Sequence, residues 1–171
     1  MSDLRMVADL MAIAARTAPK SAGQDYVVVR IVEGEELKEL AAKMLDFGER
    51  TGKRNFDRDG KNVAASDCVV LIGLKNAQPL KLDCTACGAE SCASLLVNSI
   101  EGEFRGPQCA FRVLDMGIAL GSAVKLAAML NVDNRIMYRA GVVAREMGLI
   151  DADYVMGIPL SATGKSIYFD R

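Results

Sequence analysis

The stretch from residue 68 to residue 74, CVVLIGL, is continuously apolar and rich in β-branched side chains. Such a run predicts a strand that is buried on both faces of a sheet. Residues 26–32, YVVVRIV, have nearly the same character and predict a second core strand. Residues 154–160, YVMGIPL, predict a last strand, which ends near Pro159. A sheet with two apolar faces needs helices to cover them.

Segments with helical spacing of apolar residues surround these strands. Ser2 is the expected N-cap of the first helix, and Gly148 is the expected stop of the last. The polar residues 49–61 contain the turn pair Asp59-Gly60 and predict an exposed loop. The predicted helices cover residues 2–16, 35–47, 114–130 and 141–147. With no repeat or long linker, residues 1–171 form one predicted α+β domain, with a Cys-rich insert at about 76–112.

Composition excludes several kinds of function. The 171 residues carry a formal net charge of −1, so bulk electrostatics give no reason to expect a nucleic-acid partner. The chain has no His, which removes His-based catalysis and His-ligated metals. Asp9 interrupts the apolar N-terminal stretch, and no run is apolar enough to span a membrane. We expect a cytoplasmic protein that binds neither membranes nor nucleic acids.

Four of the five cysteines lie close together in the sequence, at positions 84, 87, 92 and 109. Their spacing is C-x2-C-x4-C-x16-C. Four thiolates are the ligand set of a 4Fe–4S or 2Fe–2S cluster, and also of an all-cysteine zinc site. The spacing favours an iron–sulfur cluster on Cys84, Cys87, Cys92 and Cys109, because structural zinc more often uses two C-x2-C pairs. Cys68 begins the apolar strand and is expected to be a buried structural thiol.

Two alternatives to a cluster remain. One is structural zinc on the same four cysteines. The other is a site without metal, including a dithiol pair at Cys84 and Cys87, but that pair leaves Cys92 and Cys109 without a role. For a cluster, the acidic residues Asp83, Glu90 and 101–103 are expected to place negative charge nearby and lower its potential.

The cysteine spacing resembles the 4Fe–4S domain in the B subunit of Rnf electron-transport complexes and in the large subunit of the corrinoid iron–sulfur protein. The whole chain resembles a family of uncharacterised ferredoxin-domain-containing proteins of anaerobic bacteria and archaea. The segments that carry this resemblance are AARTAPKSAGQD, DCTACGAESC, DMGIALGSAV, NRIMYRAG and GIPLSATGKSIYFDR. It implies a 4Fe–4S cluster and leaves the reaction open.

A weaker resemblance is to the nitroreductase family. It rests on APKSAGQDYVVVRIV followed by a helix and CVVLIGL, and on the order of DMGIALGSAVKLAAMLNV and REMGLIDADYVMGIPL. The resemblance implies a helix/sheet/helix sandwich and a homodimer that binds FMN at its interface. The Arg-rich segment that usually holds the FMN phosphate is not recognisable. The candidate substitutes are Arg16, Lys20 and Ser21, and we expect no tight FMN binding.

These observations favour an iron–sulfur electron-transfer protein that exchanges single electrons with a partner protein not identified by the sequence. A first alternative is an FMN-dependent oxidoreductase that is fed by the cluster. A second is a non-redox module with a structural zinc site. The tail sequence Gly164-Lys165-Ser166 lacks the first glycine of a phosphate-binding loop and is expected to pack on the domain.

Overall fold

A computed structural model describes residues 4–169 of the chain, so the expected N-cap Ser2 lies outside the described residues. The centre of the molecule is a four-stranded sheet in which each neighbouring pair is antiparallel. In spatial order the strands are β1 (Val27–Glu33), β2 (Cys68–Leu74), β4 (Tyr154–Ser161) and β3 (Asp133–Asn134).

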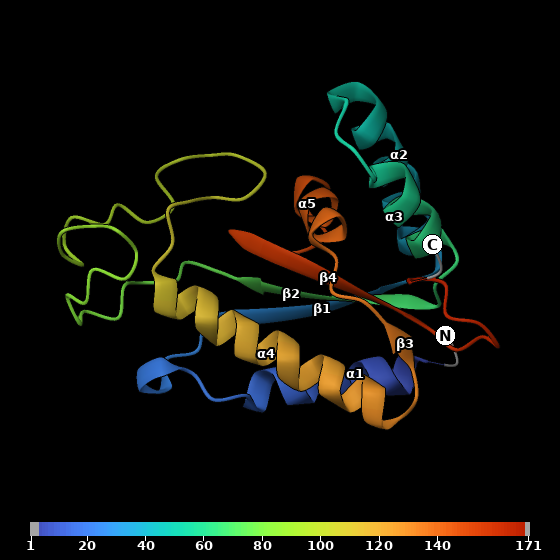
Figure 1. Ribbon diagram of the computed structural model, residues 1–171, viewed down its shortest axis with the longest axis horizontal. Helices are drawn as coiled ribbons and strands as arrows, with labels where there is room; N and C mark the ends of the chain where they lie inside the picture. The colour runs from blue at the N-terminus through green and yellow to red at the C-terminus, as the bar shows by residue number, and fades with distance from the viewer. Residues whose placement is uncertain (1–3, 170–171) are drawn as a thin grey trace.

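Helices cover both faces of this sheet, as Figure 1 shows. One layer consists of α1 (Arg5–Thr17) and α4 (Ala110–Met129). The other consists of α2 (Gly34–Thr51), α3 (Phe56–Ala64) and α5 (Tyr138–Glu146). The fold is therefore the predicted helix/sheet/helix sandwich of the α+β class. No helix within residues 4–169 is long and apolar enough to cross a membrane.

Strand β2 lies between β1 and β4, and all seven of its residues are buried. Because side chains alternate along a strand, Val69 and Leu71 enter the core beneath α2 and α5. Val70 and Ile72 enter the core beneath α1 and α4. This double burial explains why the sequence of β2 is continuously apolar rather than alternating.

The expectation of an exposed loop at residues 49–61 was wrong. Helix α2 continues to Thr51, and α3 begins at Phe56. Phe56, Gly60 and Val63 face the core, and Gly60 lies so close to α2 that an added Cβ would be 3.1 Å from the Ala41 carbonyl oxygen. The buried face contains a glycine and a paired Asp, so few large apolar residues mark this helix in the sequence although its packing is tight.

Helix α4 begins at Ala110, four residues before the predicted start. Cys109 is consequently its N-cap residue, and the last cysteine of the motif leads directly into a 20-residue helix. Helix α5 spans Tyr138–Glu146 and the last strand ends at Ser161, close to the predicted bounds. The C-terminal tail packs on the domain as expected, because Tyr168 is buried.

Candidate metal centre

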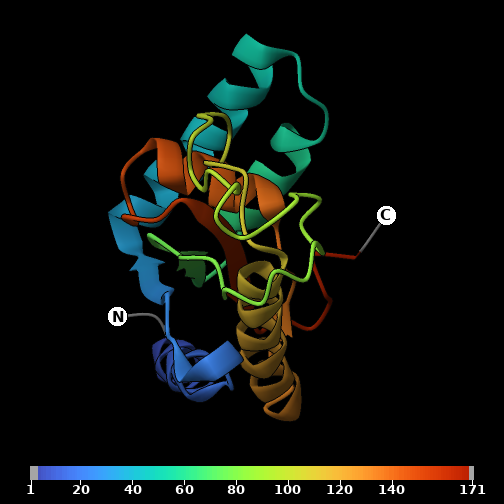
Figure 2. The same cartoon turned by 90° about the vertical axis from the view of Figure 1, so that its left-hand side faces the viewer.

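Residues 75–109 form the insert between β2 and α4, and none of them belongs to a helix or a strand. The insert extends beyond one end of the sheet, next to the first turn of α4 (Figures 1 and 2). Lys81, Asp83 and Thr85 have left-handed backbone conformations, which interrupt any regular structure around Cys84. The backbone therefore winds in short turns and presents the cysteine side chains from a compact loop.

The four predicted ligands come together in this region. Cys84 is exposed, Cys87 and Cys92 are partly exposed, and Cys109 is buried; all four are thiols rather than disulfides. They line one small pocket, whose wall also includes Leu80, Leu82, Ala110 and Phe111. The pocket thus joins a thiol from the start of α4 to three thiols from the insert.

Backbone groups brace the cysteine loop. The amide of Asp83 donates a hydrogen bond to Cys92 Sγ at 3.4 Å, and the amide of Cys92 donates to Asp83 Oδ1 at 2.7 Å. Amide donors to cysteine sulfur are a means by which proteins tune iron–sulfur centres. Cys109 is the N-cap residue of α4 and so lies at the positive end of the helix dipole.

Four thiols are a donor set that an iron–sulfur cluster accepts. A zinc ion would hold its sulfur ligands about 2.3 Å from one point. No three Cys, Asp or Glu side chains among residues 4–169 are arranged to hold one ion. A cluster gives each iron its own thiolate, so its ligands surround a shared volume instead of one point. All four cysteines line this pocket together with the apolar residues Leu80, Leu82 and Phe111.

Cys68 lies apart from this pocket. It is buried at the first position of β2, whereas the insert leaves the last position of that strand, Leu74. Six steps along a strand span about 20 Å. Cys68 packs in the core beneath α1 and α4, as expected for a structural thiol.

The expected ring of negative charge is only partly present. Asp83 braces the cysteine loop, but Glu101 and Glu103 line a different cavity of about 630 Å³. There Glu101 pairs with Arg105 and Arg145, and these two guanidinium groups hold its pKa below the usual range. Neither Glu101 nor Glu103 lines the cysteine pocket itself.

Two of the three residues considered as ligands of an FMN phosphate, Lys20 and Ser21, already make hydrogen bonds within the protein. The Lys20 ammonium, 5% exposed, donates to the Ala15 and Arg16 carbonyl oxygens and so caps the end of α1. Ser21 lies in the short 3₁₀ turn Ser21–Gly23. Its amide and hydroxyl both donate to Asp115 Oδ1, at 2.8 and 2.7 Å. Arg16 is exposed to solvent.

Arg112 is a site-forming residue that the sequence analysis did not single out. It is fully buried near the start of α4 and stacks on the Tyr26 ring, 4.9 Å from the ring centre. Its guanidinium donates to the carbonyl oxygens of Gln78 and Ser21 and to the Asp115 carboxylate. It thereby ties the insert to the α1–β1 turn. The available signal in the sequence was an arginine only three residues after Cys109, at the start of a mostly apolar helix.

A cavity of about 570 Å³ adjoins the cysteine pocket. Its lining includes Gln24 and Tyr26 from the α1–β1 connection and Gln78 and Lys81 from the insert. Cys92 lines both cavities. Leu80 also lines both, so these two residues lie between the candidate metal centre and the larger cavity.

Comparison with solved structures defines the class of fold. A nitroreductase with bound FMN from Desulfitobacterium hafniense superposes with a TM-score of 0.60 and 13% identity, covering 96% of this chain and 80% of that one. A putative nitroreductase in complex with FMN from Desulfovibrio desulfuricans gives a TM-score of 0.60 at 12% identity, covering 100% and 80%. The fold is nitroreductase-like, as the sequence resemblance implied.

Sequence comparison defines the family within that fold. An uncharacterized protein from Archaeoglobus fulgidus is 52% identical over 169 residues, which cover 98% of this chain and 91% of that protein. Residues 105–171 match the model of a family described as "Uncharacterized protein containing a ferredoxin domain (DUF2148)". The chain belongs to this family of ferredoxin-domain proteins. Of the four pocket cysteines, the matched segment includes Cys109.

Proposed function

We propose that this protein holds a 4Fe–4S cluster on Cys84, Cys87, Cys92 and Cys109 and transfers single electrons to or from a partner protein in the reducing cytoplasm. The observation that carries the proposal is that all four cysteines line one pocket. The ferredoxin-domain description of the family supports the same cofactor. A 4Fe–4S cluster supplies one-electron oxidation and reduction.

The residues of this chain would bind, screen and tune the cluster. The four thiolates would bind iron, while Leu80, Leu82 and Phe111 keep water from one side of the pocket. The Asp83 amide, already bonded to Cys92 Sγ, would stabilise negative charge on sulfur. Cys84 is exposed, so a docked redox partner would approach the centre from the side of this residue.

The visible spectrum of the anaerobically purified protein tests the proposal. An iron–sulfur cluster gives a broad brown absorption, a flavin gives a yellow two-band spectrum, and zinc gives no colour. We expect the brown spectrum, with iron and acid-labile sulfide present in equal amounts. A colourless protein with one zinc per chain would replace the proposal with the structural-zinc alternative.

A flavoenzyme is the second candidate function, and the cavity beside Cys92 is the observation that favours it. The fold neighbours named above were solved with FMN. We nevertheless propose that FMN does not bind tightly, because Lys20 and Ser21 must give up internal hydrogen bonds before they can contact a phosphate. Each lost charge-assisted bond costs about 1.5–3 kcal/mol.

Titration calorimetry of the anaerobic protein with FMN checks this expectation. No tight binding should be seen. Micromolar or stronger binding, abolished by Arg16→Ala or Lys20→Ala, would contradict it and make the cluster-fed oxidoreductase the leading function.

We further propose a homodimer formed through the outer face of α1 and α4. Figure 1 shows these helices side by side on one face of the sheet. Their outer face exposes several large apolar side chains, namely Met6, Leu10, Ile13, Leu114 and Ile118. Gly117 and Gly121 add open backbone on α4, against which a second helix can pack closely.

A further inference from the structure

Asp153 lies outside the cysteine motif in sequence but next to both ends of the insert in space. Its amide donates to the Leu74 carbonyl oxygen at 2.7 Å, at the point where the chain leaves β2 for the insert. Its own carbonyl oxygen accepts from the Arg105 amide at 2.8 Å, on the arm that returns to Cys109. The backbone of Asp153, directly before β4, therefore contacts both arms of the insert.

The side-chain carboxylate of Asp153 also contacts both arms of the insert. Oδ2 accepts from the Asn76 amide at 2.6 Å and from Asn98 Nδ2 at 3.1 Å, and Oδ1 lies 3.5 Å from the Arg105 guanidinium. These partners lie at the start, in the middle and near the end of the insert. Asp153 is only 4% exposed, and a carboxylate is buried at such cost only where several donors compensate it.

Further hydrogen bonds connect the partners of the Asp153 carboxylate to the residues just before Cys109. Gln108 Nε2 donates to Asn98 Oδ1 and to the Arg105 carbonyl oxygen, and the Asn98 amide donates to the Pro107 carbonyl oxygen. Asn98 thus links the buried carboxylate of Asp153 to the residue that precedes Cys109. Gln108, the residue directly before Cys109, therefore belongs to the hydrogen-bond network that includes Asp153.

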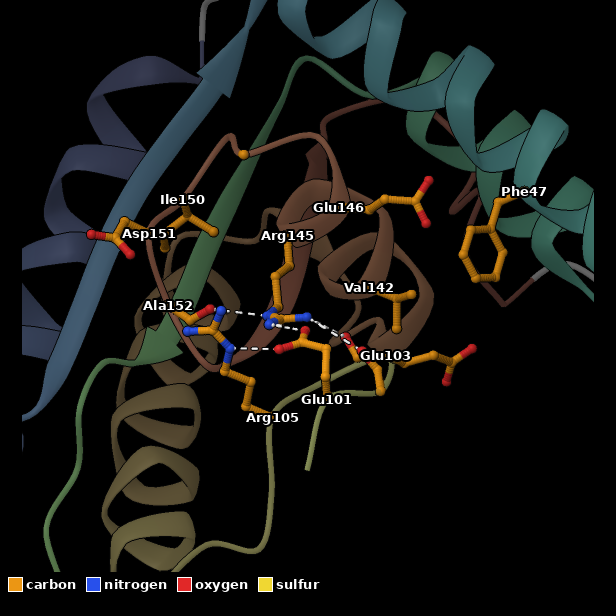
Figure 3. A pocket seen from close by; sticks show the side chains of 12 residues that line it. Phe47, Glu101, Glu103, Arg105, Val142, Arg145, Glu146, Ile150, Asp151 and Ala152 are labelled. Carbon is orange, nitrogen blue, oxygen red and sulfur yellow. Dashed lines mark hydrogen bonds and ion pairs between the residues drawn. The ribbon is translucent and has the colours of Figure 1, made fainter. Parts of the chain in front are cut away.

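Arg145 on α5 holds the remaining turn of the returning arm. Figure 3 shows its side chain directed between Glu101 and Glu103, with Arg105 on the far side of Glu101. Its guanidinium donates to the carbonyl oxygens of Gly102 and Glu103 and to Glu101 Oε1, and also to the Ala152 carbonyl oxygen beside Asp153. The turn 101–105 is fastened to the same corner of the fold.

From these contacts we propose that Asp153 is a positioning residue for the metal centre: it holds the two arms of the insert at a fixed separation and so brings Cys109 to the loop that carries the other three cysteines. This inference rests on the proposed function. It adds a residue that is 44 positions beyond the last cysteine, that binds no metal, and that acts through Asn76, Asn98 and Arg105.

The test compares Asp153→Ala with Asp151→Ala, whose side chain is 85% exposed and pairs with Lys75 at the surface. Hydrogen–deuterium exchange is measured on the full chain before cluster loading. Iron and sulfide are measured after anaerobic reconstitution, and the electron paramagnetic resonance spectrum is recorded after the reconstituted cluster has been reduced by one electron with dithionite. For Asp153→Ala we expect at least tenfold faster exchange at residues 98–108, unchanged exchange in α2, less than half the wild-type iron, and a broadened resonance signal. Asp151→Ala should match the wild type in all four measurements.

Asn98→Ala provides a gentler variant, because it removes one donor and leaves the buried carboxylate paired. Asn98→Ala should show the same changes to a smaller degree. If Asp153→Ala loses the exchange protection of α2, its fold as a whole is disturbed, and the result for Asn98→Ala then decides the test. Wild-type exchange and iron content in both variants would overturn the inference. A wild-type chain that takes up no cluster would overturn the proposed function instead, and the exchange data would still establish whether Asp153 holds the insert.

Discussion

Individual buried polar residues determine how the C-terminal tail and the insert attach to the rest of the fold. Arg112 and Asp153 fasten the insert, and Tyr168 fastens the C-terminal tail through a 2.9 Å hydrogen bond with the Ser66 hydroxyl. Each is buried and each connects segments that are far apart in sequence. A buried polar group that loses its partner costs about 1–3 kcal/mol, so these contacts specify the arrangement of the segments.

Tyr168 gives a pH-dependent prediction. Burial raises its pKa from 10.0 to about 12, although its hydrogen bond with Ser66 acts in the opposite direction. Because the folded pKa is raised, the neutral phenol stabilises the folded state fully below pH 10, and that contribution is lost as the pH rises toward about 12. An ultraviolet titration of tyrosine ionisation should therefore contain a late phase, and stability should fall across this window.

Tyr168→Phe is the matched variant for that titration. It should remove the latest phase of phenol ionisation and weaken the dependence of stability on pH above 10. A late phase of the same size in Tyr168→Phe would mean that another tyrosine is responsible.

At the scale of elements, the close approach of α5 to β4 depends on a glycine. A Cβ on Gly141 would lie 2.0 Å from the Val155 carbonyl oxygen, so any larger residue must push the helix away from the sheet. We expect Gly141→Ala to destabilise the fold by about 3 kcal/mol or more, as overpacked core sites do. Thermal unfolding measures this change.

Gly164→Ala is the control, because its added Cβ meets nothing within 4 Å. Its unfolding temperature should stay within about a degree of the wild type, which corresponds to the small effect of most surface substitutions. Equal stability of the two variants would show that α5 is not held against β4 in the way described.

The sequence predicts the elements whose apolar pattern is strong and misses those held by polar or small residues. Strand β2 is found because burial on both sides leaves a continuous apolar run, and helix α4 is found because most of its residues are apolar. Helix α3 is missed because its buried face includes Gly60 and Asp59, the latter paired with Arg58 and Arg139. The cysteines stand out by type and spacing, whereas Asp153 cannot be found by either, since its role exists only in the folded contacts.

At the scale of the whole molecule, the two helix layers differ in their outer surfaces. The α1–α4 layer exposes the apolar side chains that we propose as the dimer interface, and the insert that carries the cysteines extends beyond one end of the sheet (Figure 1). Two-fold symmetric pairs are the commonest oligomers, and exposed apolar patches mark interaction sites.

Light scattering should therefore give roughly twice the chain mass of 18.4 kDa. Ile118→Glu places a charge in the proposed interface and should give the monomer mass. Leu96→Glu, at an exposed position in the insert, should leave the dimer intact. A wild-type monomer at micromolar concentration, or a dimer that survives Ile118→Glu, would contradict this interface.

The central claim is that four cysteines in one pocket hold a cluster, and iron and acid-labile sulfide content across single Cys→Ser variants tests it most directly. The anaerobic wild type should contain about four of each per chain. Serine at position 84, 87, 92 or 109 should lower both, whereas Cys68→Ser should retain them, because Cys68 is buried at the far end of β2. Equal loss in Cys68→Ser, or no loss in any of the other four, would contradict the assignment of the metal centre.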